Sequence, residues 1–423
     1  MRFSSLLTSG LASFPLVAGH PTVTPTEHSV QQVRNPIYKR DGIAALLKVH
    51  RKYHIDLPDY LAASALARRD GTGSITNRPI DDDAEWLTPV QIGNPPRTFQ
   101  MDLDTGSSDL WVHGSQSAAA GGSRTRYNST ASKSCEEMSD SKWLIEYGDG
   151  SGASGHVVKD TVSIGGLSVQ AQAVQVADKV HDSFAQQQNV DGLVGLGFHS
   201  INTVIPKKQK TFFENAKDDH GAAVFTADLQ HDAPGTYTFG IINKTAYTGD
   251  ITYTDVDPSS GMWMFTSVGF TVGDGKLNKR SISAIADTGT SLIWLPDDIN
   301  KAYYSQVDGA KVDKIAGGYV FPCDAKLPDF TVVVSGSSTG ITVPGAYMNF
   351  APLEGPKPVG AGQRAKRSDK SSGSGTCFGG LQSSSGSGLN IIGDVALKAA
   401  FVVFDADKRR IGFAKKKTLR GDK

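Results

Sequence analysis

An Asp-Thr-Gly turn between two apolar segments constrains this chain more than any other feature of its sequence. In Phe99–Val112 an alternating apolar run ends at Asp104, the turn follows, and an apolar Leu-Trp-Val run closes the stretch. The same arrangement returns in Ile285–Leu295, where Asp287 opens Asp-Thr-Gly-Thr-Ser. Internal repeats of this kind indicate structural units of similar layout. We therefore interpret the chain as two scaffolds that bring two carboxylates together.

Each turn is followed far downstream by two apolar residues and a glycine. These segments are Leu193-Val194-Gly195 after the first turn and Ile391-Ile392-Gly393 after the second. A single Asp-Thr-Gly occurs often in ordinary turns and would be weak evidence alone. Two copies in matched apolar frames, each with the same trailing segment, predict that Asp104 and Asp287 form one catalytic site.

Two other interpretations of these segments fail on inspection. Asp102–Gly106 resembles the aspartyl-phosphate motif DxDx[TV], but Gly106 occupies the position that needs Thr or Val. The glycines of Gly192–Gly197 suggest a nucleotide-binding loop, but no helical pattern or trailing acidic residue follows them. We interpret them as turns of a β structure.

Two carboxylates within hydrogen-bonding distance have a defined chemistry. Both cannot ionise easily, so the pair shares one proton and its pKa values split. The ionised member takes a proton from a water that attacks a peptide carbonyl, and the protonated member donates to that carbonyl. Such a site needs no metal and no cofactor, and we expect none. Gly106 and Gly289 would let the main chain approach the carboxylates, and Thr105 and Thr288 would link the two turns.

Length and composition favour a two-lobed β protein. The 423 residues exceed one ordinary hydrophobic core, and 46 glycines favour a turn-rich fold. Short alternating or β-branched runs, separated by turn residues, predict strands. The clearest strands are Thr161–Ile164, Val169–Val176, Thr236–Phe239, Phe330–Val334 and Phe401–Phe404, and the clearest helices are Lys207–Asn215 and Asp297–Gln306.

These patterns predict an all-β fold with minor helices and two similar lobes. We place the N-terminal lobe at residues 70–255, with the first Asp-Thr-Gly turn. The C-terminal lobe covers 256–423 and carries the second turn. Within it, residues 354–376 are rich in Pro, Gly, Ser and charge without periodicity, which predicts a disordered loop.

The first 69 residues differ from the rest of the chain in charge. They hold 9 lysines and arginines against 4 aspartates and glutamates, whereas the remainder holds 34 against 39. Two explanations are open: the basic N-terminal segment pairs electrostatically with the acidic remainder of the chain, or the two charge imbalances are unrelated. We favour electrostatic pairing, and we favour it also over a nucleic-acid-binding arm. Residues 1–19 resemble a secretory signal peptide, with an early arginine, a modest apolar core and small residues at the end.

Residues 20–69 are then a basic propeptide, with a helical pattern in Gly42–Tyr53, ending at the dibasic pair Arg68-Arg69. No apolar run approaches the roughly 20 residues that span a bilayer. We therefore expect no membrane and no nucleic-acid partner.

Three cysteines, Cys135, Cys323 and Cys377, cannot all pair within one chain, and their spacing is not that of a metal or redox site. Cys323 and Cys377 lie in the same half of the chain and are the favoured pair, which would leave Cys135 as a free thiol. A secreted chain meets an oxidising compartment, where a disulfide is stable. Asn128 and Asn243 begin Asn-x-Ser/Thr triplets and are candidates for glycosylation.

Further segments give the chain a resemblance that covers nearly its whole length. These segments are Glu85–Gly93, both Asp-Thr-Gly turns, Trp143–Gly155, Asp191–Gly197, Cys377–Gln382, Ile391–Asp394 and Phe401–Asp405. On these motifs the chain resembles the secreted fungal pepsin-like aspartic endopeptidases, the group of aspergillopepsin and penicillopepsin. The resemblance implies a bilobal β fold with a central cleft that binds protein and peptide substrates.

The resemblance also implies roles for single residues. Tyr147-Gly148-Asp149 falls at the tip of a β-hairpin flap over the substrate, and an aromatic beside Gly-Asp-Gly independently predicts a hairpin turn. Asp149 and Ser151 would receive a substrate lysine beside the scissile bond and so broaden a mainly hydrophobic preference.

The hydroxyls of Ser107 and Thr290 would support the catalytic carboxylates. Gly106, Gly289 and Thr290 would also contact substrate. The second-lobe disulfide of the family falls on Cys323 and Cys377.

In zymogens of this family a propeptide lysine, followed by tyrosine, lies in the cleft against the aspartates. Lys52-Tyr53 matches that pair, which would make the propeptide an intramolecular inhibitor that low pH releases by protonating its acidic partners. The sequence departs from the family at three places. Trp86 stands where Tyr is usual, Cys135 lacks an obvious partner, and loop 354–376 is longer than expected, with Lys366-Arg367 open to nicking.

Two other classes of function compete with this one. A non-catalytic binding protein on the same scaffold would be expected to have lost an aspartate, the flap tyrosine or a turn glycine, and all are present. A dibasic-specific processing protease anchored at the cell surface is disfavoured because the C-terminal residues are basic and polar. The leading hypothesis is a monomeric, extracellular, acid-acting endopeptidase, made as a zymogen, that cleaves between bulky apolar residues.

Overall fold

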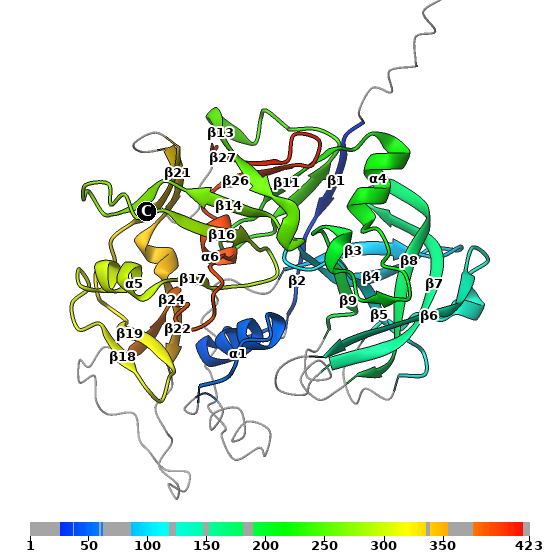
Figure 1. Ribbon diagram of the computed structural model, residues 1–423, viewed down its shortest axis with the longest axis horizontal. Coiled ribbons are helices and arrows are strands. Elements are labelled where there is room, and N and C mark those ends of the chain that lie inside the picture. Colours follow the sequence, from blue (N-terminus) through cyan, green and yellow to red (C-terminus); the bar gives the residue numbers. More distant parts are fainter. Residues whose placement is uncertain are drawn as a thin grey trace, which may run out of the picture.

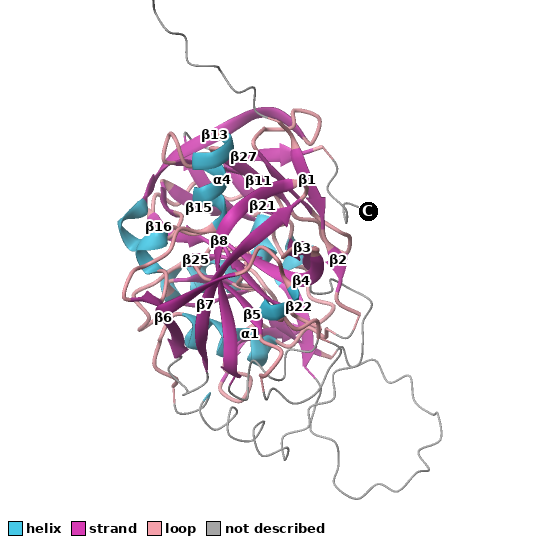
Figure 2. Ribbon diagram, turned by 90° about the vertical axis from the view of Figure 1, so that its right-hand side faces the viewer, coloured by secondary structure: helices cyan, strands magenta, loops and turns pink. Residues whose placement is uncertain are grey.

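Strands dominate the computed structural model of the protein, which describes residues 26–36, 38–58, 61, 86–117, 124–146, 152–180, 189–335, 339–353 and 375–417. Two β-rich lobes lie side by side and helices are few (Figures 1 and 2). The prediction of an all-β, two-lobed fold is confirmed. The expected signal peptide, the dibasic pair Arg68-Arg69 and residues 354–374 of the predicted loop lie outside the described residues.

The elements before the first lobe are β1 (His28–Gln31), β2 (Val33–Arg34) and α1 (Gly42–Lys52). The first lobe and the segment that leaves it contain β3 (Trp86–Ile92), β4 (Arg97–Asp104), β5 (Leu110–His113), η1 (Ser129–Ala131), β6 (Glu136–Glu146), β7 (Gly152–Ile164), β8 (Leu167–Val180), β9 (Gly192–Gly195), η2 (His199–Ile201), β10 (Val204–Ile205), α4 (Phe212–His220), β11 (Val224–Asp228), β12 (Thr236–Phe239) and β13 (Tyr247–Asp257).

The elements of the second lobe follow. They are η3 (Pro258–Ser260), β14 (Met264–Ser267), β15 (Gly269–Val272), β16 (Ile282–Ala286), β17 (Ile293–Leu295), α5 (Asp297–Tyr304), β18 (Lys311–Asp313), β19 (Gly318–Pro322), β20 (Phe330–Ser335), β21 (Thr339–Val343), η4 (Gly345–Met348), β22 (Asn349–Leu353), β23 (Thr376–Gly379), β24 (Leu381–Ser383), β25 (Ile391–Ile392), α6 (Asp394–Leu397), β26 (Phe401–Asp405) and β27 (Arg410–Lys416).

The first lobe is built on a nine-stranded sheet with the order β10-β6-β7-β8-β5-β9-β4-β3-β2. Because side chains alternate between the faces of a strand, β4 buries Phe99, Met101 and Leu103 in the core. The opposite face of β4 carries Asp102, which is half-buried, and Asp104 at the strand end, which is buried. The alternating pattern thus delivers two carboxylates to one face of the strand.

The order of the central strands explains the repeated sequence pattern. β4 pairs in parallel with β9, so that Asp104 lies opposite Gly195, and β5 pairs with the other side of β9. In the second lobe β25 likewise lies between β16, its parallel partner, and β17. The backbone N–H of Leu196 donates to the carbonyl of Asp104 (2.8 Å), and that of Asp287 donates to the carbonyl of Ile392 (3.1 Å). The trailing apolar segments are therefore the strands that hold the two aspartates.

An eleven-stranded sheet with the order β1-β12-β11-β26-β27-β13-β14-β16-β25-β17-β24 extends from the N-terminal segment into the second lobe. Its β1 pairs with β12, and β11 pairs with the late strand β26. Two smaller sheets, β15-β20-β21 and β18-β19-β23-β22, complete the second lobe. The expected boundary between residues 255 and 256 falls inside β13, and the division of the chain there remains a prediction.

Local sequence sets the ends of the helices. α4 begins at Phe212, later than the predicted start at Lys207, because Thr211 and Glu214 form a capping box that satisfies the first backbone donors. The helix predicted over Asp297–Gln306 is α5, which ends at Tyr304.

α1 lies between the two lobes (Figure 1). Its first turn is capped by Asp41, whose Oδ1 accepts a hydrogen bond from the backbone N–H of Ala44 (3.0 Å). Its buried residues are Gly42, Ile43, Ala45, Leu46, Leu47, Val49 and His50. The basic residues of its last turn suit the negative end of the helix dipole. Helical propensity contributes little to so short a segment, so burial between the lobes holds α1 in place.

A disulfide joins Cys323, just after β19, to Cys377 on β23. Cys135 is a free, half-buried thiol. Among the described residues no helix is both long and apolar enough to cross a membrane.

Candidate active site

The first Asp-Thr-Gly turn holds its carboxylate from two directions. The backbone N–H of Gly106 donates to Asp104 Oδ1 (2.8 Å), and Ser107 Oγ donates to Asp104 Oδ2 (2.6 Å). Asp104 is 1 % exposed, so these donors replace the water that a carboxylate would otherwise bind. Both donors favour the ionised form of the carboxylate.

The second turn repeats this arrangement. The backbone N–H of Gly289 donates to Asp287 Oδ1 (2.9 Å), and the Thr290 hydroxyl donates to Asp287 Oδ2. Asp287 is fully buried. Because both lobes supply one backbone donor and one hydroxyl donor, the near-identity of the two motifs corresponds to a near-symmetric site.

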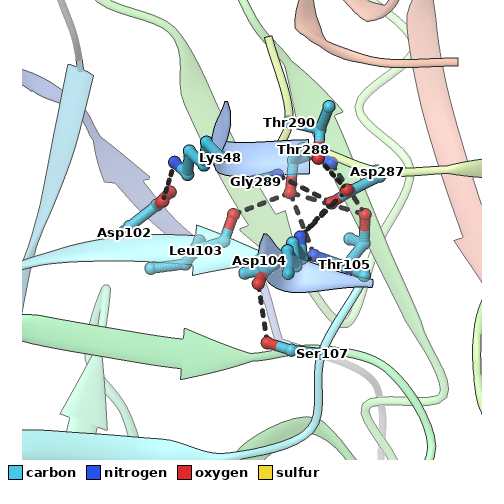
Figure 3. Close-up of polar contacts among 12 residues, drawn as sticks. Lys48, Asp102, Leu103, Asp104, Thr105, Ser107, Asp287, Thr288, Gly289 and Thr290 are labelled. Carbon is cyan, nitrogen blue, oxygen red and sulfur yellow. Dashed lines mark hydrogen bonds and ion pairs between the residues drawn. The ribbon is translucent and has the colours of Figure 1, made fainter. Parts of the chain in front are cut away.

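The threonines of the two motifs cross-link the lobes (Figure 3). The backbone N–H of Thr105 donates to Thr288 Oγ1 (3.1 Å), and that of Thr288 donates to Thr105 Oγ1 (3.0 Å). Each hydroxyl in turn donates to a carbonyl of the opposite lobe, that of Ala286 (2.7 Å) or Leu103 (2.6 Å). This reciprocal network fixes the distance between the two aspartates.

Each turn glycine lies against the carboxylate of the other turn. A Cβ on Gly289 would lie 2.4 Å from Asp104 Oδ1, and a Cβ on Gly106 would lie 2.6 Å from Asp287 Oδ1. These separations leave no room for a side chain. Glycine is therefore required at both positions by the approach of the carboxylates.

Two residues from the N-terminal segment lie between the carboxylates. Lys52 Nζ donates to Asp104 Oδ1 (2.6 Å) and to both oxygens of Asp287 (2.9 Å each). Tyr53 OH donates to Asp287 Oδ2 (2.5 Å). The structure thus brings together Lys52, Tyr53 and both predicted aspartates from segments far apart in the chain.

The charges of this cluster are strongly coupled. Burial acts to raise the pKa of Asp287, but the charge of Lys52 and hydrogen bonds from neighbouring groups outweigh burial and hold that pKa well below its usual range. Burial raises the pKa of Asp104 to about 6, although Lys52 opposes the shift. Burial acts to lower the pKa of Lys52, but the two carboxylates raise it above its usual value. Lys52 is therefore a cation, Asp287 an anion, and Asp104 the carboxylate that takes up a proton more readily.

A second ion pair was not predicted from the sequence. Lys48 Nζ lies 3.5 Å from Asp102 Oδ2 (Figure 3). Four residues along a helix and two along a strand both span about 6–7 Å. The spacing of Lys48 and Lys52 on α1 therefore matches that of Asp102 and Asp104 on β4. Asp102 and Asp104 lie on the same face of β4, and this shared face was the sequence signal from which the Lys48–Asp102 ion pair could have been predicted.

A cavity of about 830 Å³ surrounds the cluster. Lys48, Lys52 and Tyr53 line it together with residues of both Asp-Thr-Gly turns. The predicted flap residues Tyr147, Gly148, Asp149 and Ser151 lie outside the described residues.

Paired carboxylates at the junction of two β lobes define the class of aspartic-type hydrolases. Comparison with known proteins agrees with this class, because the model for "Eukaryotic aspartyl protease" matches residues 85–416. The chain belongs to the eukaryotic aspartyl protease family.

Fungal relatives resemble the chain over almost its full length. It is 48 % identical to endothiapepsin from Cryphonectria parasitica over 430 residues, covering 98 % of each chain. It is 45 % identical to aspergillopepsin-1 from Aspergillus pseudoglaucus and 44 % identical to penicillopepsin-1 from Talaromyces stipitatus, in each case over 97 % of this chain and 98 % of the relative. The predicted resemblance to fungal pepsin-like aspartic endopeptidases is confirmed, and the protein is a hydrolase of peptide bonds.

Proposed function

We propose that the protein is a secreted endopeptidase that acts at acid pH, is made as a zymogen and uses Asp104 and Asp287 to activate a water molecule. The observation that carries this proposal is the position of Lys52 Nζ, within 2.9 Å of oxygens from both aspartates. The ammonium group stands where a water bound to both carboxylates would lie after the N-terminal segment leaves. The same contacts support the proposal that residues 20–69 act as an intramolecular inhibitor.

The proposed mechanism follows from the two ionisation states. With the N-terminal segment removed, an ionised carboxylate takes a proton from the bound water, which attacks the carbonyl carbon of the scissile peptide. The protonated carboxylate donates to the carbonyl oxygen and later supplies a proton to the leaving nitrogen. The cross-linked threonines keep both carboxylates at the distance that this exchange requires.

We propose a preference for bulky hydrophobic residues around the scissile bond, with lysine also accepted through Asp149 and Ser151. The apolar side chains of Ile145, Leu193 and Met262 line the cavity and support the hydrophobic preference.

Secretion is proposed from the signal-like sequence of residues 1–19. A disulfide between Cys323 and Cys377 suits an oxidising compartment. The two glycosylation candidates adopt the same local turn. Asn128 Oδ1 accepts from the backbone N–H (3.1 Å) and hydroxyl (2.9 Å) of Thr130, and Asn243 Oδ1 accepts from the same groups of Thr245 at 2.9 and 2.7 Å. Both threonines are exposed, which supports modification at the surface of a monomeric enzyme.

The hydroxyl of Thr290 provides a test of how the carboxylates are tuned. Thr290→Val removes the donor to Asp287 Oδ2 and so destabilises the ionised carboxylate. We expect the pKa of Asp287 to rise by about one to two units, since hydrogen bonds to charged groups contribute about 1.5–3 kcal/mol and one pKa unit corresponds to about 1.4 kcal/mol. The acidic limb of kcat/KM against pH, measured with a fluorogenic peptide, should move to higher pH by a similar amount.

Thr342→Val on β21 is the matched control, because the Thr342 hydroxyl lies at an exposed position, 3.0 Å from the Thr331 hydroxyl on the neighbouring strand. Its pH profile should overlay that of the wild type. An unchanged acidic limb in Thr290→Val would show that this hydroxyl does not tune the catalytic pair.

Digestion of a denatured protein tests the proposed function itself. The activated enzyme should cleave haemoglobin or casein at about pH 4, where carboxylate pairs hold one proton. A peptide that mimics the tetrahedral transition state should inhibit the cleavage. A correctly folded chain that binds such peptides without cleaving protein would instead be a binding protein on the protease scaffold.

A further inference from the structure

His50 occupies an unusual position for an ionisable residue at the end of α1. Its side chain is 5 % exposed, and its ring packs edge-on against the indole of Trp294 at a centroid distance of 5.2 Å. Trp294 belongs to β17, the strand that follows the second Asp-Thr-Gly turn. His50 therefore joins the N-terminal segment directly to the scaffold of Asp287.

The ring also closes the turn that follows α1. His50 Nδ1 lies 3.0 Å from the carbonyl oxygen of Asp56 and 3.3 Å from that of Ile55. Carbonyl oxygens only accept hydrogen bonds, so the contacts assign the proton of the neutral ring to Nδ1. Lys52 and Tyr53 lie within the segment that these bonds close, and the bonds hold both residues in the site.

The charged groups near His50 do not offset a positive ring. On α1, Lys52 is itself a cation and is already paired with both catalytic aspartates. After the helix, Asp56 contacts the ring through its carbonyl oxygen. On β17, Ile293–Leu295 contains no titratable side chain. A proton added to the ring would therefore place a charge in a buried site whose described contacts supply no counter-ion.

We propose that His50 is the pH sensor of the masked enzyme: protonation of its buried ring undocks α1 and withdraws Lys52 from the aspartates. The inference rests on the proposed masking role of the N-terminal segment. It goes beyond that role because it assigns the trigger to a residue that touches neither aspartate.

The direction of the pH effect follows from proton linkage. Burial lowers the pKa of His50 in the docked state, although the two carbonyl oxygens oppose the shift. After release the ring is in water, where the pKa of histidine is about 6.5. The docked state thus binds fewer protons than the released state below about pH 6.5, and docking weakens by up to about tenfold per pH unit as pH falls.

The catalytic carboxylates do not provide this trigger at the same pH. Asp104, with a pKa of about 6, can take up a proton while Lys52 keeps both of its bonds to Asp287. Asp287 stays ionised far below its usual range because Lys52 is bound to it. Between about pH 6.5 and 4, the usual pKa values of histidine and aspartate, His50 is therefore the group whose protonation opposes masking.

The experiment follows release of the N-terminal segment from the full chain. Protein held at neutral pH is moved to a series of buffers from about pH 7 to 3.5, a range that spans both usual pKa values. The rate of loss of the segment is measured by mass spectrometry, and the appearance of activity is measured at one fixed pH. The wild type should accelerate by up to about tenfold per unit below pH 6.5. His50→Asn, which keeps a donor near the position of Nδ1 but cannot be protonated, should lack this acceleration and lag by up to about thirtyfold at pH 5.

His54→Asn is the matched control. His54 is exposed and has a φ of 53°, a conformation that asparagine tolerates well. The pH dependence of segment loss in His54→Asn should match that of the wild type. If His50→Asn fails to fold, His50→Phe keeps a ring against Trp294 without a titratable group and should show the same flat profile.

The outcomes distinguish the proposal that His50 senses pH from the proposal that the N-terminal segment blocks the active site. If a folded His50 variant loses the segment with the same pH dependence as the wild type, the proposed role of His50 is overturned. Faster loss of the segment from that variant at pH 5 also overturns it, since the charged ring would then stabilise docking. If the wild-type full chain at pH 6.5 cleaves a peptide as fast as the chain without the segment, the masking proposal itself fails.

Discussion

Asp287→Asn is expected to lower kcat by about 10⁴-fold, the upper range for general acid–base catalysis. Asparagine keeps the size of the side chain; its carbonyl oxygen can still accept from the Gly289 N–H, and its NH₂ group can donate to the Thr290 hydroxyl. It cannot hold the negative charge that removes a proton from the attacking water. Asp104→Asn should have an effect of the same order, because the two carboxylates act as one unit.

Hydrolysis of a fluorogenic peptide at acid pH measures the loss. Asp298→Asn on α5 is the control, since the carboxylate of Asp298 forms an exposed pair with Arg280 (2.9 Å) and lies outside the site. Its kcat should remain near that of the wild type. Full activity in a folded Asp287→Asn or Asp104→Asn variant would contradict the proposed mechanism.

Lys52→Ala should unmask the site at neutral pH. The change leaves two buried carboxylates without their shared cation, and removing one partner of a buried ion pair costs about 3–5 kcal/mol. Docking of α1 should therefore weaken by about 10²-fold to about 4 × 10³-fold, by the rule that about 1.4 kcal/mol is a factor of ten. The measurement is the affinity of the full chain at pH 6.5 for a peptide that mimics the transition state, determined by calorimetry. This readout reports access to the site without requiring activity.

Lys48→Ala is the matched control for Lys52→Ala. It removes an ammonium from the same helix and the same face, but the Lys48–Asp102 pair is longer (3.5 Å) and its side chains are 35 % and 20 % exposed. Partly exposed pairs contribute at most about 1 kcal/mol, so the affinity should change less than about fivefold. Equal inhibitor affinities in the wild type and Lys52→Ala would show that Lys52 does not block the site.

The proposed masking of the site would combine contacts of different strength. Lys52 forms ion pairs with the carboxylates at the centre of the site, and Lys48, one helical turn earlier, forms an ion pair with Asp102. His50 donates a hydrogen bond to the carbonyl of Asp56 and so holds the turn that follows α1. The contact of Lys52 with Asp287 is nearly insensitive to mild acid because the pKa of Asp287 is held so low. The proposed protonation of His50 in mild acid would let release of the N-terminal segment begin before Asp287 is neutralised.

The elements that depend on local pattern and internal repetition could be predicted from the amino-acid sequence alone. The alternation of β4 and the repeated Asp-Thr-Gly motif identified Asp104 and Asp287 as a pair, because both signals lie within short segments. The trailing apolar-apolar-Gly segments were identified in the same way and prove to be β9 and β25. Lys52 and Tyr53 were identified by family resemblance, since nothing in their local sequence shows what they contact.

Which distant side chains meet could not be predicted in this way and became known from the three-dimensional fold. Lys48 faces Asp102, and His50 packs on Trp294, because α1 is buried between two lobes whose relative position is set by the whole fold. The reciprocal fit of Gly106 and Gly289 against opposite carboxylates likewise exists only once the lobes are joined. Contacts between residues far apart in the sequence depend on packing geometry, which no local periodicity records.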